Sequence, residues 1–285
     1  MDKRMHPKGA DLRPMDKRLH PKQKYLEGKR MHPEAAAISS LAAKWNIVSS
    51  ETWNLTDPCS GPANSSEQIG NPGIKCDCSY NNGTICHVTQ MRVYALDKTG
   101  QFPEELTNLT YLFDLTLSQN YFNGPLPAFV GNLTNMQYLS LGINSFSGPV
   151  PKELGNLRKL IILSFSSNSF NGTLPPELGN LTLLQELYID SAGVTGEIPA
   201  TFRNLQKLNK LWASDNLFTG EIPDFMGSWT ELTELRLQGT ALKGPIPSSF
   251  SNLTSLTNLI ISDLTSGVSL SSLTFLQDLK NLTQL

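Results

Sequence analysis

The four cysteines are the residues whose spacing points most directly to chemistry. They are the only cysteines among 285 residues, and they lie close together: Cys59, Cys76, Cys78 and Cys86. An even number in one short, asparagine-rich segment predicts two local disulfides formed in an oxidising compartment. Four cysteines allow three pairings, and the spacing does not choose among them. The alternative is a zinc site, which we disfavour because Cys76 and Cys78 have C-x-C spacing, whereas structural zinc sites use C-x2–4-C pairs.

Sequons of the form N-x-S/T also indicate an exported protein. Some of these sequons arose independently. The others belong to an Asn-Leu-Thr that recurs with the repeat, so they are copies of a single sequon. The independent sequon asparagines are Asn54, Asn64, Asn82 and Asn171, and the repeated ones are Asn108, Asn132, Asn180, Asn252 and Asn281. We predict N-glycosylation at these positions.

Catalytic and cofactor-binding motifs are absent from the sequence. His87 is the only histidine after position 33, and we expect it to have a structural role. The segment Asp224-Phe225-Met226-Gly227 superficially resembles a kinase D-F-G, but no glycine-rich loop with its lysine and no H-R-D accompany it. We therefore expect no catalytic residue, no metal and no cofactor, and a protein that binds a partner.

The charge is divided unevenly along the chain. Residues 1–33 hold ten Lys/Arg against four Asp/Glu, a net charge of +6, whereas the remainder holds thirteen against twenty-one, a net charge of −8. Because the main part is acidic, general attraction to nucleic acid or to an anionic membrane surface is not expected.

Residues 1–33 form a basic, low-complexity segment in which M-D-K-R-M-H-P-K recurs with one change from Met15. We expect it to be disordered and to result from an incorrectly predicted gene start. It contains no apolar h-region, and the chain has no run of about 18 apolar residues, so neither a signal peptide nor a membrane helix is visible. Residues 34–87 are expected to form an N-terminal cap, with a helix over Glu34 to Ile47 and Pro33 in its first turn, followed by the cysteine segment.

A period of 24 residues runs through the rest of the chain. Proline follows three residues after each glycine of one series: Gly100, Gly124, Gly148, Gly172, Gly196, Gly220 and Gly244. Internal repeats of this length predict a solenoid, because one coil cannot bury its own leucines and must stack on its neighbours. Residues 88–285 are therefore expected to hold about eight repeats. Leu285 falls at the start of a new strand with no capping segment after it, which predicts a fragment of a longer protein.

Each repeat has an L-x-L segment that alternates apolar and polar residues, which predicts a short strand with its leucines in the core. Gly and Pro then end the strand and turn the chain. An asparagine at the ninth position of the repeat is expected to satisfy backbone groups of that turn: Asn120, Asn144, Asn168 and Asn216. Leu96, Ala192 and Thr240 replace it in three repeats, where we predict looser turns.

The repeat, with its G-x-I/L-P segment, resembles that of plant leucine-rich-repeat ectodomains. A more specific resemblance is to plant leucine-rich-repeat receptor-like serine/threonine kinases of the subgroup with a malectin-like domain. It is carried by C-D-C-S-Y-N-N-G-T from Cys76, R-V-Y-A-L from Arg92 and W-A-S-D-N from Trp212, and it covers roughly residues 34–285. The resemblance implies an α/β fold: a right-handed, horseshoe-shaped solenoid with a parallel inner β-sheet, a second small sheet and a disulfide-stapled N-terminal cap. It also implies the sensing half of a receptor, whose relatives continue with a malectin-like domain, one membrane helix and a kinase.

Strand residues that point away from the core should stack in columns about 4.8 Å apart on the inner sheet. Counted from residue 88, the early coils offer small polar groups, whereas coils five to seven present Tyr188, Trp212 and Arg236. Charged residues flank these three: Glu186, Asp190, Lys210, Asp215 and Glu234. Aromatic and arginine side chains among charges are typical of binding hot spots, so we predict a ligand-binding surface here. The alternative is a solvated sheet face on which Lys210 bridges Glu186 and Glu234.

These observations favour the ligand-sensing or co-receptor ectodomain of a receptor kinase, at the extracellular face of the plasma membrane or in the apoplast. The expected partner is a protein, peptide or glycan ligand, or a co-receptor ectodomain. One alternative is a secreted or cell-wall repeat protein, such as an inhibitor of foreign wall-degrading enzymes. Another is a truncated gene product without an independent role.

Overall fold

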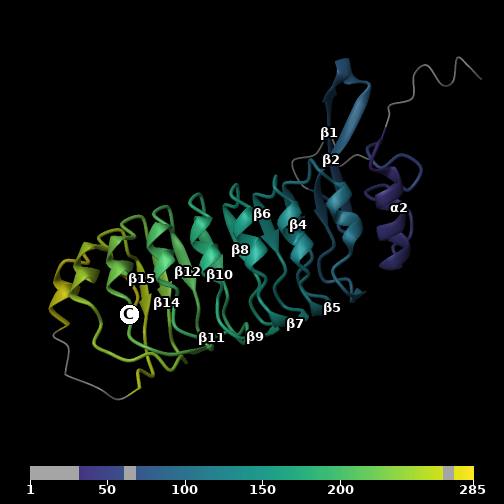
Figure 1. Cartoon of the computed structure of the whole chain (residues 1–285). Helices are drawn as coiled ribbons and strands as arrows, with labels where there is room; N and C mark the ends of the chain where they lie inside the picture. Colours follow the sequence, from purple (N-terminus) through teal and green to yellow (C-terminus); the bar gives the residue numbers. More distant parts are fainter. Residues whose placement is uncertain (1–31, 61–68, 266–272) are drawn as a thin grey trace, which may run out of the picture.

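The computed structural model describes residues 32–60, 69–265 and 273–285. The predictions for residues 1–31 and for the sequon at Asn64 lie outside these ranges. The coils stack side by side along one axis, from helix α2 at one end to the C-terminal residues at the other (Figure 1). This arrangement confirms the solenoid that the 24-residue period predicts.

The inner sheet has nine strands in the order β1-β2-β4-β6-β8-β10-β12-β14-β15. All neighbours pair in parallel except β1 and β2, which form an antiparallel hairpin. The strands are β1 (Gly73–Tyr80), β2 (Ile85–Arg92), β4 (Asp114–Thr116), β6 (Tyr138–Ser140), β8 (Ile162–Ser164), β10 (Glu186–Tyr188), β12 (Lys210–Trp212), β14 (Glu234–Arg236) and β15 (Asn258–Ile260).

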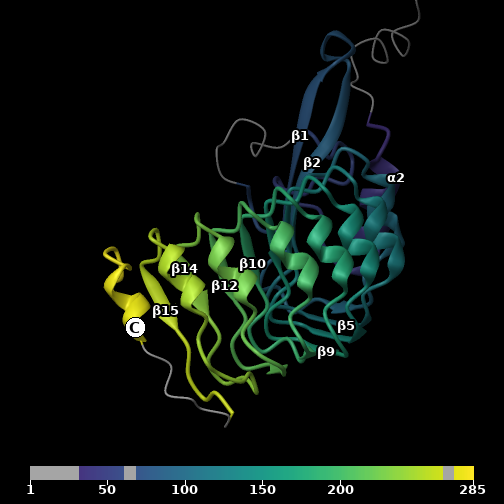
Figure 2. The same cartoon turned by 60° about the vertical axis from the view of Figure 1, so that its left-hand side comes forward.

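Short strands and 3-10 helices complete each coil. The G-x-I/L-P segments lie in or beside two smaller parallel sheets, whose strands are β3 (Thr99–Gly100), β5 (Tyr121–Pro125), β7 (Ser145–Pro149), β9 (Ser169–Asn171), β11 (Thr195–Gly196) and β13 (Leu217–Phe218). The 3-10 helices form a row beside the inner strands (Figure 2). They are η2 (Asn81–Gly83) in the cap, then η3 (Glu104–Asn108), η4 (Ala128–Asn132), η5 (Lys152–Asn156), η6 (Pro176–Asn180), η7 (Ala200–Asn204), η8 (Asp224–Ser228), η9 (Ser248–Asn252) and η10 (Leu273–Gln277).

The core is one continuous cluster that runs from the cap to the last coil. The predicted leucine positions fill it: Leu115, Leu139 and Leu163, for example, have no exposed surface. Burying each such side chain contributes about 1.5–3 kcal/mol, so the stacked coils stabilise one another. Close stacking also constrains the 3-10 helices, because a Cβ at Gly179 would lie 2.5 Å from the carbonyl oxygen of Thr201 in the next coil.

The asparagine of the ninth position links neighbouring coils, as expected. In Asn216, Oδ1 accepts hydrogen bonds from the backbone N–H groups of three residues of the previous coil, 192 to 194, and Nδ2 donates to the carbonyl of Ile189 at 2.7 Å. These bonds leave Ala192 fully buried, and the hydroxyl of Thr240 donates to the carbonyl of Leu237 at 3.0 Å. The backbone N–H of Leu96 likewise donates to Asn120 Oδ1 at 3.1 Å. Neighbouring groups thus supply part of the hydrogen bonding, and looser turns at Leu96, Ala192 and Thr240 stay a prediction.

The cap begins with α2 (Ala35–Lys44), shorter than the predicted Glu34 to Ile47. The helix ends because Asn46 adopts a left-handed backbone, with φ of 48°. We had predicted Pro33 in the first turn, and this prediction is wrong, because Pro33 precedes the N-cap residue Glu34. The buried face of α2, which includes Ile38 and Leu41, covers the first coil, so the helix closes one end of the core.

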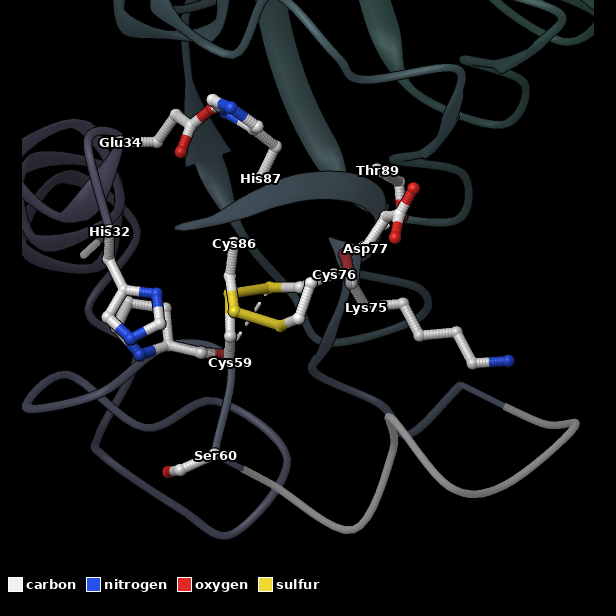
Figure 3. Close-up of a disulfide and its surroundings, with 12 residues drawn as sticks. His32, Glu34, Cys59, Ser60, Lys75, Cys76, Asp77, Cys86, His87 and Thr89 are labelled. Atoms are coloured by element: carbon white, nitrogen blue, oxygen red, sulfur yellow. Dashed lines mark hydrogen bonds and ion pairs between the residues drawn. A yellow bond between two sulfur atoms is a disulfide. The ribbon is translucent and has the colours of Figure 1, made fainter. Parts of the chain in front are cut away.

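All four cysteines are paired, in disulfides Cys59–Cys76 and Cys78–Cys86. The two bonds lie side by side: a ring nitrogen of His32 and the Sγ atoms of Cys59 and Cys86 are all within 4.8 Å of one another (Figure 3). Because the four sulfur atoms are bonded to one another in pairs, none offers the thiolate that the zinc alternative requires.

His87 connects β2 to the start of α2. Its Nδ1 lies 2.6 Å from Oε1 of the buried Glu34 (Figure 3), and its ring stacks on Tyr111 at 3.8 Å. These contacts give His87 the structural role that we expected. Strand β2 runs through position 87, where the sequence placed the limit of the cap, so cap and solenoid share one strand. Within the described ranges, no helix combines the length and hydrophobicity that crossing a membrane requires.

Candidate functional site

The three predicted hot-spot residues occupy adjacent positions on the inner sheet. Tyr188 of β10 pairs in register with Trp212 of β12, which pairs with Arg236 of β14. Neighbouring leucines such as Leu211 point into the core, so strand alternation directs these side chains to the opposite face. We call the eight predicted residues on this face the inner-face cluster: Glu186, Tyr188, Asp190, Lys210, Trp212, Asp215, Glu234 and Arg236.

Trp212 lies at the centre of the inner-face cluster. The guanidinium carbon of Arg236 lies 3.7 Å from its ring centroid, and the ring of Tyr188 meets it edge-on at 4.9 Å. The indole Nε1 donates to Oε2 of Glu234 at 3.1 Å. Cation–π and edge-to-face contacts each contribute about 0.5–2 kcal/mol, so Trp212 is held in a fixed orientation before any partner arrives.

Ion pairs join strands β10 and β14 to strand β12 between them. Lys210 Nζ lies 3.5 Å from Glu186 and 3.7 Å from Glu234, which is the bridge that we considered as the alternative to binding. Arg236 lies 3.4 Å from Glu234. The side chains of these four residues are 22–30% exposed, so the network is half-buried and still open to solvent. The ionic bridge and the half-buried aromatic side chains of Tyr188 and Trp212 therefore coexist.

Burial changes the acid–base properties of two members. It raises the pKa of the Asp190 carboxyl, although the backbone N–H of Ser214 donates to Oδ1 at 2.9 Å. Burial and the hydrogen bond from its hydroxyl to Glu186 at 2.7 Å raise the pKa of Tyr188. Tyr188 is consequently a hydrogen-bond donor at any physiological pH, and a negative charge on Asp190 is costly without a partner.

Asp215 differs from the rest of the cluster. It is exposed just beyond the end of β12, with a left-handed backbone φ of 54°. Among the described residues, no ion pair joins Asp215 or Asp190 to a cation, whereas the other four charged members pair with one another. The site thus has a rigid aromatic centre, a paired ionic frame and two carboxylates without an ion-pair partner among the described residues, which suits recognition of a partner.

Sequence analysis missed residues at the cap end of this face. Strand β2 joins the inner sheet beside β4, and Arg92 pairs in register with Thr116. The expectation that the early coils offer only small polar groups is therefore wrong, because the first coil carries Arg92 and Tyr94. The sequence did contain a signal. Gln90, Arg92 and Tyr94 alternate with the buried Met91 and Val93, and each lies 24 positions before the first residue of a predicted column.

The sequon asparagines lie away from the inner strands throughout the described ranges. Asn108, Asn132, Asn180 and Asn252 are each the last residue of a 3-10 helix and are exposed. The others are Asn54 in a loop, Asn82 in η2, Asn171 in β9 and Asn281 near the C-terminal end. Glycans at these positions would leave the inner-face cluster accessible.

Residues 142–285 match the family described as "Leucine-rich repeat region". Two Arabidopsis thaliana proteins, named as probable LRR receptor-like serine/threonine-protein kinases, are 51% and 48% identical to this chain over 92 residues. Each match covers 30% of this chain and 9% of the relative. The chain thus spans a small part of these relatives, and no catalytic domain is evident in what it matches.

Two solved plant ectodomains share the architecture. The Arabidopsis receptor kinase HAESA, in complex with the peptide hormone IDA and the co-receptor SERK1, is 30% identical with a TM-score of 0.70, covering 88% of this chain and 40% of that one. The ectodomain of the Arabidopsis receptor kinase GASSHO1/SCHENGEN3, in complex with CASPARIAN STRIP INTEGRITY FACTOR 2, is 34% identical with a TM-score of 0.64, covering 69% and 23%.

Proposed function

Because the chain belongs to the leucine-rich-repeat proteins, we propose that it is the ligand-sensing or co-receptor module of a plant receptor-like kinase. It binds a peptide, protein or glycan ligand, or a co-receptor ectodomain, at the extracellular face of the plasma membrane or in the apoplast. The observation that carries this proposal is Trp212, held between Tyr188 and Arg236 on the open inner sheet.

The solved relatives support this proposal. HAESA and GASSHO1/SCHENGEN3 are described in complex with a peptide hormone and with CASPARIAN STRIP INTEGRITY FACTOR 2, respectively. The subgroup with a malectin-like domain also belongs to the proposal and rests on the segments at Cys76, Arg92 and Trp212. In such a receptor the kinase, the membrane helix and the malectin-like domain would come from other parts of the protein, and N-glycans would occupy the exposed sequons.

The test uses the secreted chain and two probes, a phage-displayed library of random peptides about 12 residues long and an array of plant cell-wall oligosaccharides. The peptide length is sufficient to cross the inner sheet at ~3.3 Å per residue. We expect Trp212→Ala and Arg236→Ala to weaken binding of selected ligands at least ~30-fold, because hot-spot truncations cost about 2 kcal/mol or more. The circular dichroism spectrum should stay as in wild type, and the melting temperature should fall by only a few degrees, about 2–4 °C for each kcal/mol of contact energy lost.

Arg203→Ala is the matched control, because Arg203 of η7 also stacks on an aromatic ring, Phe225, at 5.7 Å, but away from the inner strands. It should bind selected ligands as the wild type does. Unchanged binding by both Trp212→Ala and Arg236→Ala would refute the proposal.

A secreted inhibitor of foreign wall-degrading enzymes is the second function, since such a protein would use a similar inner face. Sequencing the full-length transcript at both ends separates the two. A membrane helix and a kinase downstream decide for the receptor, and a stop codon soon after the repeats decides for the secreted protein.

A further inference from the structure

We propose that Arg92, Tyr94, Asp114 and Tyr138 form a second recognition patch, which binds a carboxylate of the same extended peptide ligand that contacts the inner-face cluster. We call these four residues the cap-end patch. Arg92 pairs with Thr116, and Asp114 pairs with Tyr138, so the patch lies on neighbouring strands of one sheet. The inference rests on the proposed function, because it assumes that a ligand occupies the inner face.

Arg92 carries the argument. Its guanidinium carbon lies 5.2 Å from the ring centroid of Tyr94, and its Nε is buried without a hydrogen-bond partner. In the described part of the chain no carboxylate comes within 4.0 Å of Arg92, whereas Arg236 has Glu234 at 3.4 Å. Because no carboxylate of the described residues pairs with it, the guanidinium of Arg92 retains its terminal N–H groups, which match a carboxylate through paired donors.

Asp114 makes it possible to test whether the ligand group bound at the cap-end patch is negative or positive. Burial raises the pKa of its carboxyl, and the charge of Arg92 acts in the opposite direction. The two groups are close enough to interact without forming an ion pair. If a ligand carboxylate binds Arg92, Asp114 repels it. If the patch instead held a ligand cation, with Asp114 and the two tyrosines around it, Asp114 would attract it.

The surface between the two patches suits one extended chain. On β4, β6 and β8 the two columns that continue from Arg92 and Tyr94 carry only small side chains: Thr116, Ser118, Ser140, Gly142, Ser164 and Ser166. Five strand steps separate β2 from β12, which corresponds to about 24 Å at ~4.8 Å per step. An extended peptide covers this distance with about seven residues at ~3.3 Å each, so one segment reaches Arg92 and Trp212 together.

The experiment selects peptides from the same phage-displayed library on the wild-type chain and measures their affinity for variants. Arg92→Gln should weaken selected peptides about tenfold, since hydrogen bonds to charged groups contribute about 1.5–3 kcal/mol. The acidic residue of the peptide should lie about seven positions from the peptide residue that contacts Trp212, at ~3.3 Å per residue. Replacing that acidic residue should weaken binding to a similar extent. The same replacement measured on Arg92→Gln should weaken binding little further. Asp114→Asn should strengthen binding, and the control Arg203→Gln should leave it unchanged.

The outcomes separate this inference from the proposed function. Loss of binding in Trp212→Ala with unchanged binding in Arg92→Gln overturns the second patch and leaves the proposed function intact. Weaker binding in Asp114→Asn overturns the carboxylate and identifies a cationic ligand group. Selected peptides without an acidic residue at the expected spacing also contradict the inference. Failure to enrich any peptide, together with binding on the oligosaccharide array, overturns the peptide class.

Discussion

Trp212 shows why the inner face suits recognition at the level of single residues. Its ring contacts Tyr188 and Arg236, and its indole N–H is bonded to Glu234, so little rotamer freedom remains to be lost. Ordering flexible side chains at an interface costs about 0.5–1.5 kcal/mol each, and a side chain that is already fixed avoids most of that cost. The same contacts explain how a half-buried tryptophan on the sheet face is compatible with a stable fold.

The cost of burying the charged carboxylate of Asp190 can be tested through the pH dependence of stability. Its folded-state pKa is raised, chiefly by burial, so the folded chain holds the proton more tightly than the unfolded chain. The resulting stability is present while the carboxyl is protonated and is lost as pH rises through the raised pKa. Asp190→Asn should therefore reduce this pH dependence and raise Tm at neutral pH by roughly 1–3 °C.

Thermal unfolding monitored by circular dichroism from acidic to neutral pH measures this effect. Asp278→Asn, at an exposed position on the outer side, is the matched control and should leave the profile as in wild type. A lower Tm in Asp190→Asn at neutral pH would show that Asp190 stabilises the fold through Arg236, and the burial argument would then be wrong.

At the level of elements, the repeats could be predicted from the sequence and the cap could not. The 24-residue spacing places Leu187, Leu211 and Leu235 in register, and the structure pairs them as expected. The cap has no such period, and only the alternation from Gln90 to Tyr94 indicated that the end of β2 would join the inner sheet. The disulfide pairing was open for the same reason, since three pairings satisfy the spacing equally and only tertiary packing selects one.

The two disulfides should contribute unequally to the cap. Cys59–Cys76 closes a separation of 17 residues and Cys78–Cys86 one of 8. Because a longer loop loses more entropy when it is cross-linked, we expect about 3 kcal/mol from the first and about 2.5 kcal/mol from the second. Paired Cys→Ser variants, compared by denaturant unfolding and by limited proteolysis of residues 34–92, measure this difference.

Both pairs of variants should retain the melting behaviour of the later coils, because contacts in a repeat array are mainly between neighbours. Equal loss of stability in the two variants, or a greater loss without Cys78–Cys86, would contradict the loop-length argument.

At the level of the whole molecule, three features favour the inner face as the proposed binding surface. Sequons of the described ranges lie off the inner strands, the predicted hot-spot residues lie on them, and α2 closes one end of the core. The columns follow from the period, but the stacking of Arg236 on Trp212 and the free guanidinium of Arg92 depend on side-chain rotamers, which spacing does not determine.

The most direct measurement of the central claim is photo-cross-linking of a selected peptide to the wild-type chain, with the attachment sites located by mass spectrometry. A peptide with a photoreactive residue at each position in turn should attach to strands β10, β12 and β14, within residues 186–236, and to the inner face of the sheet. Attachment mainly to the 3-10 helices η5 to η8, with the inner strands unmodified, would contradict the account.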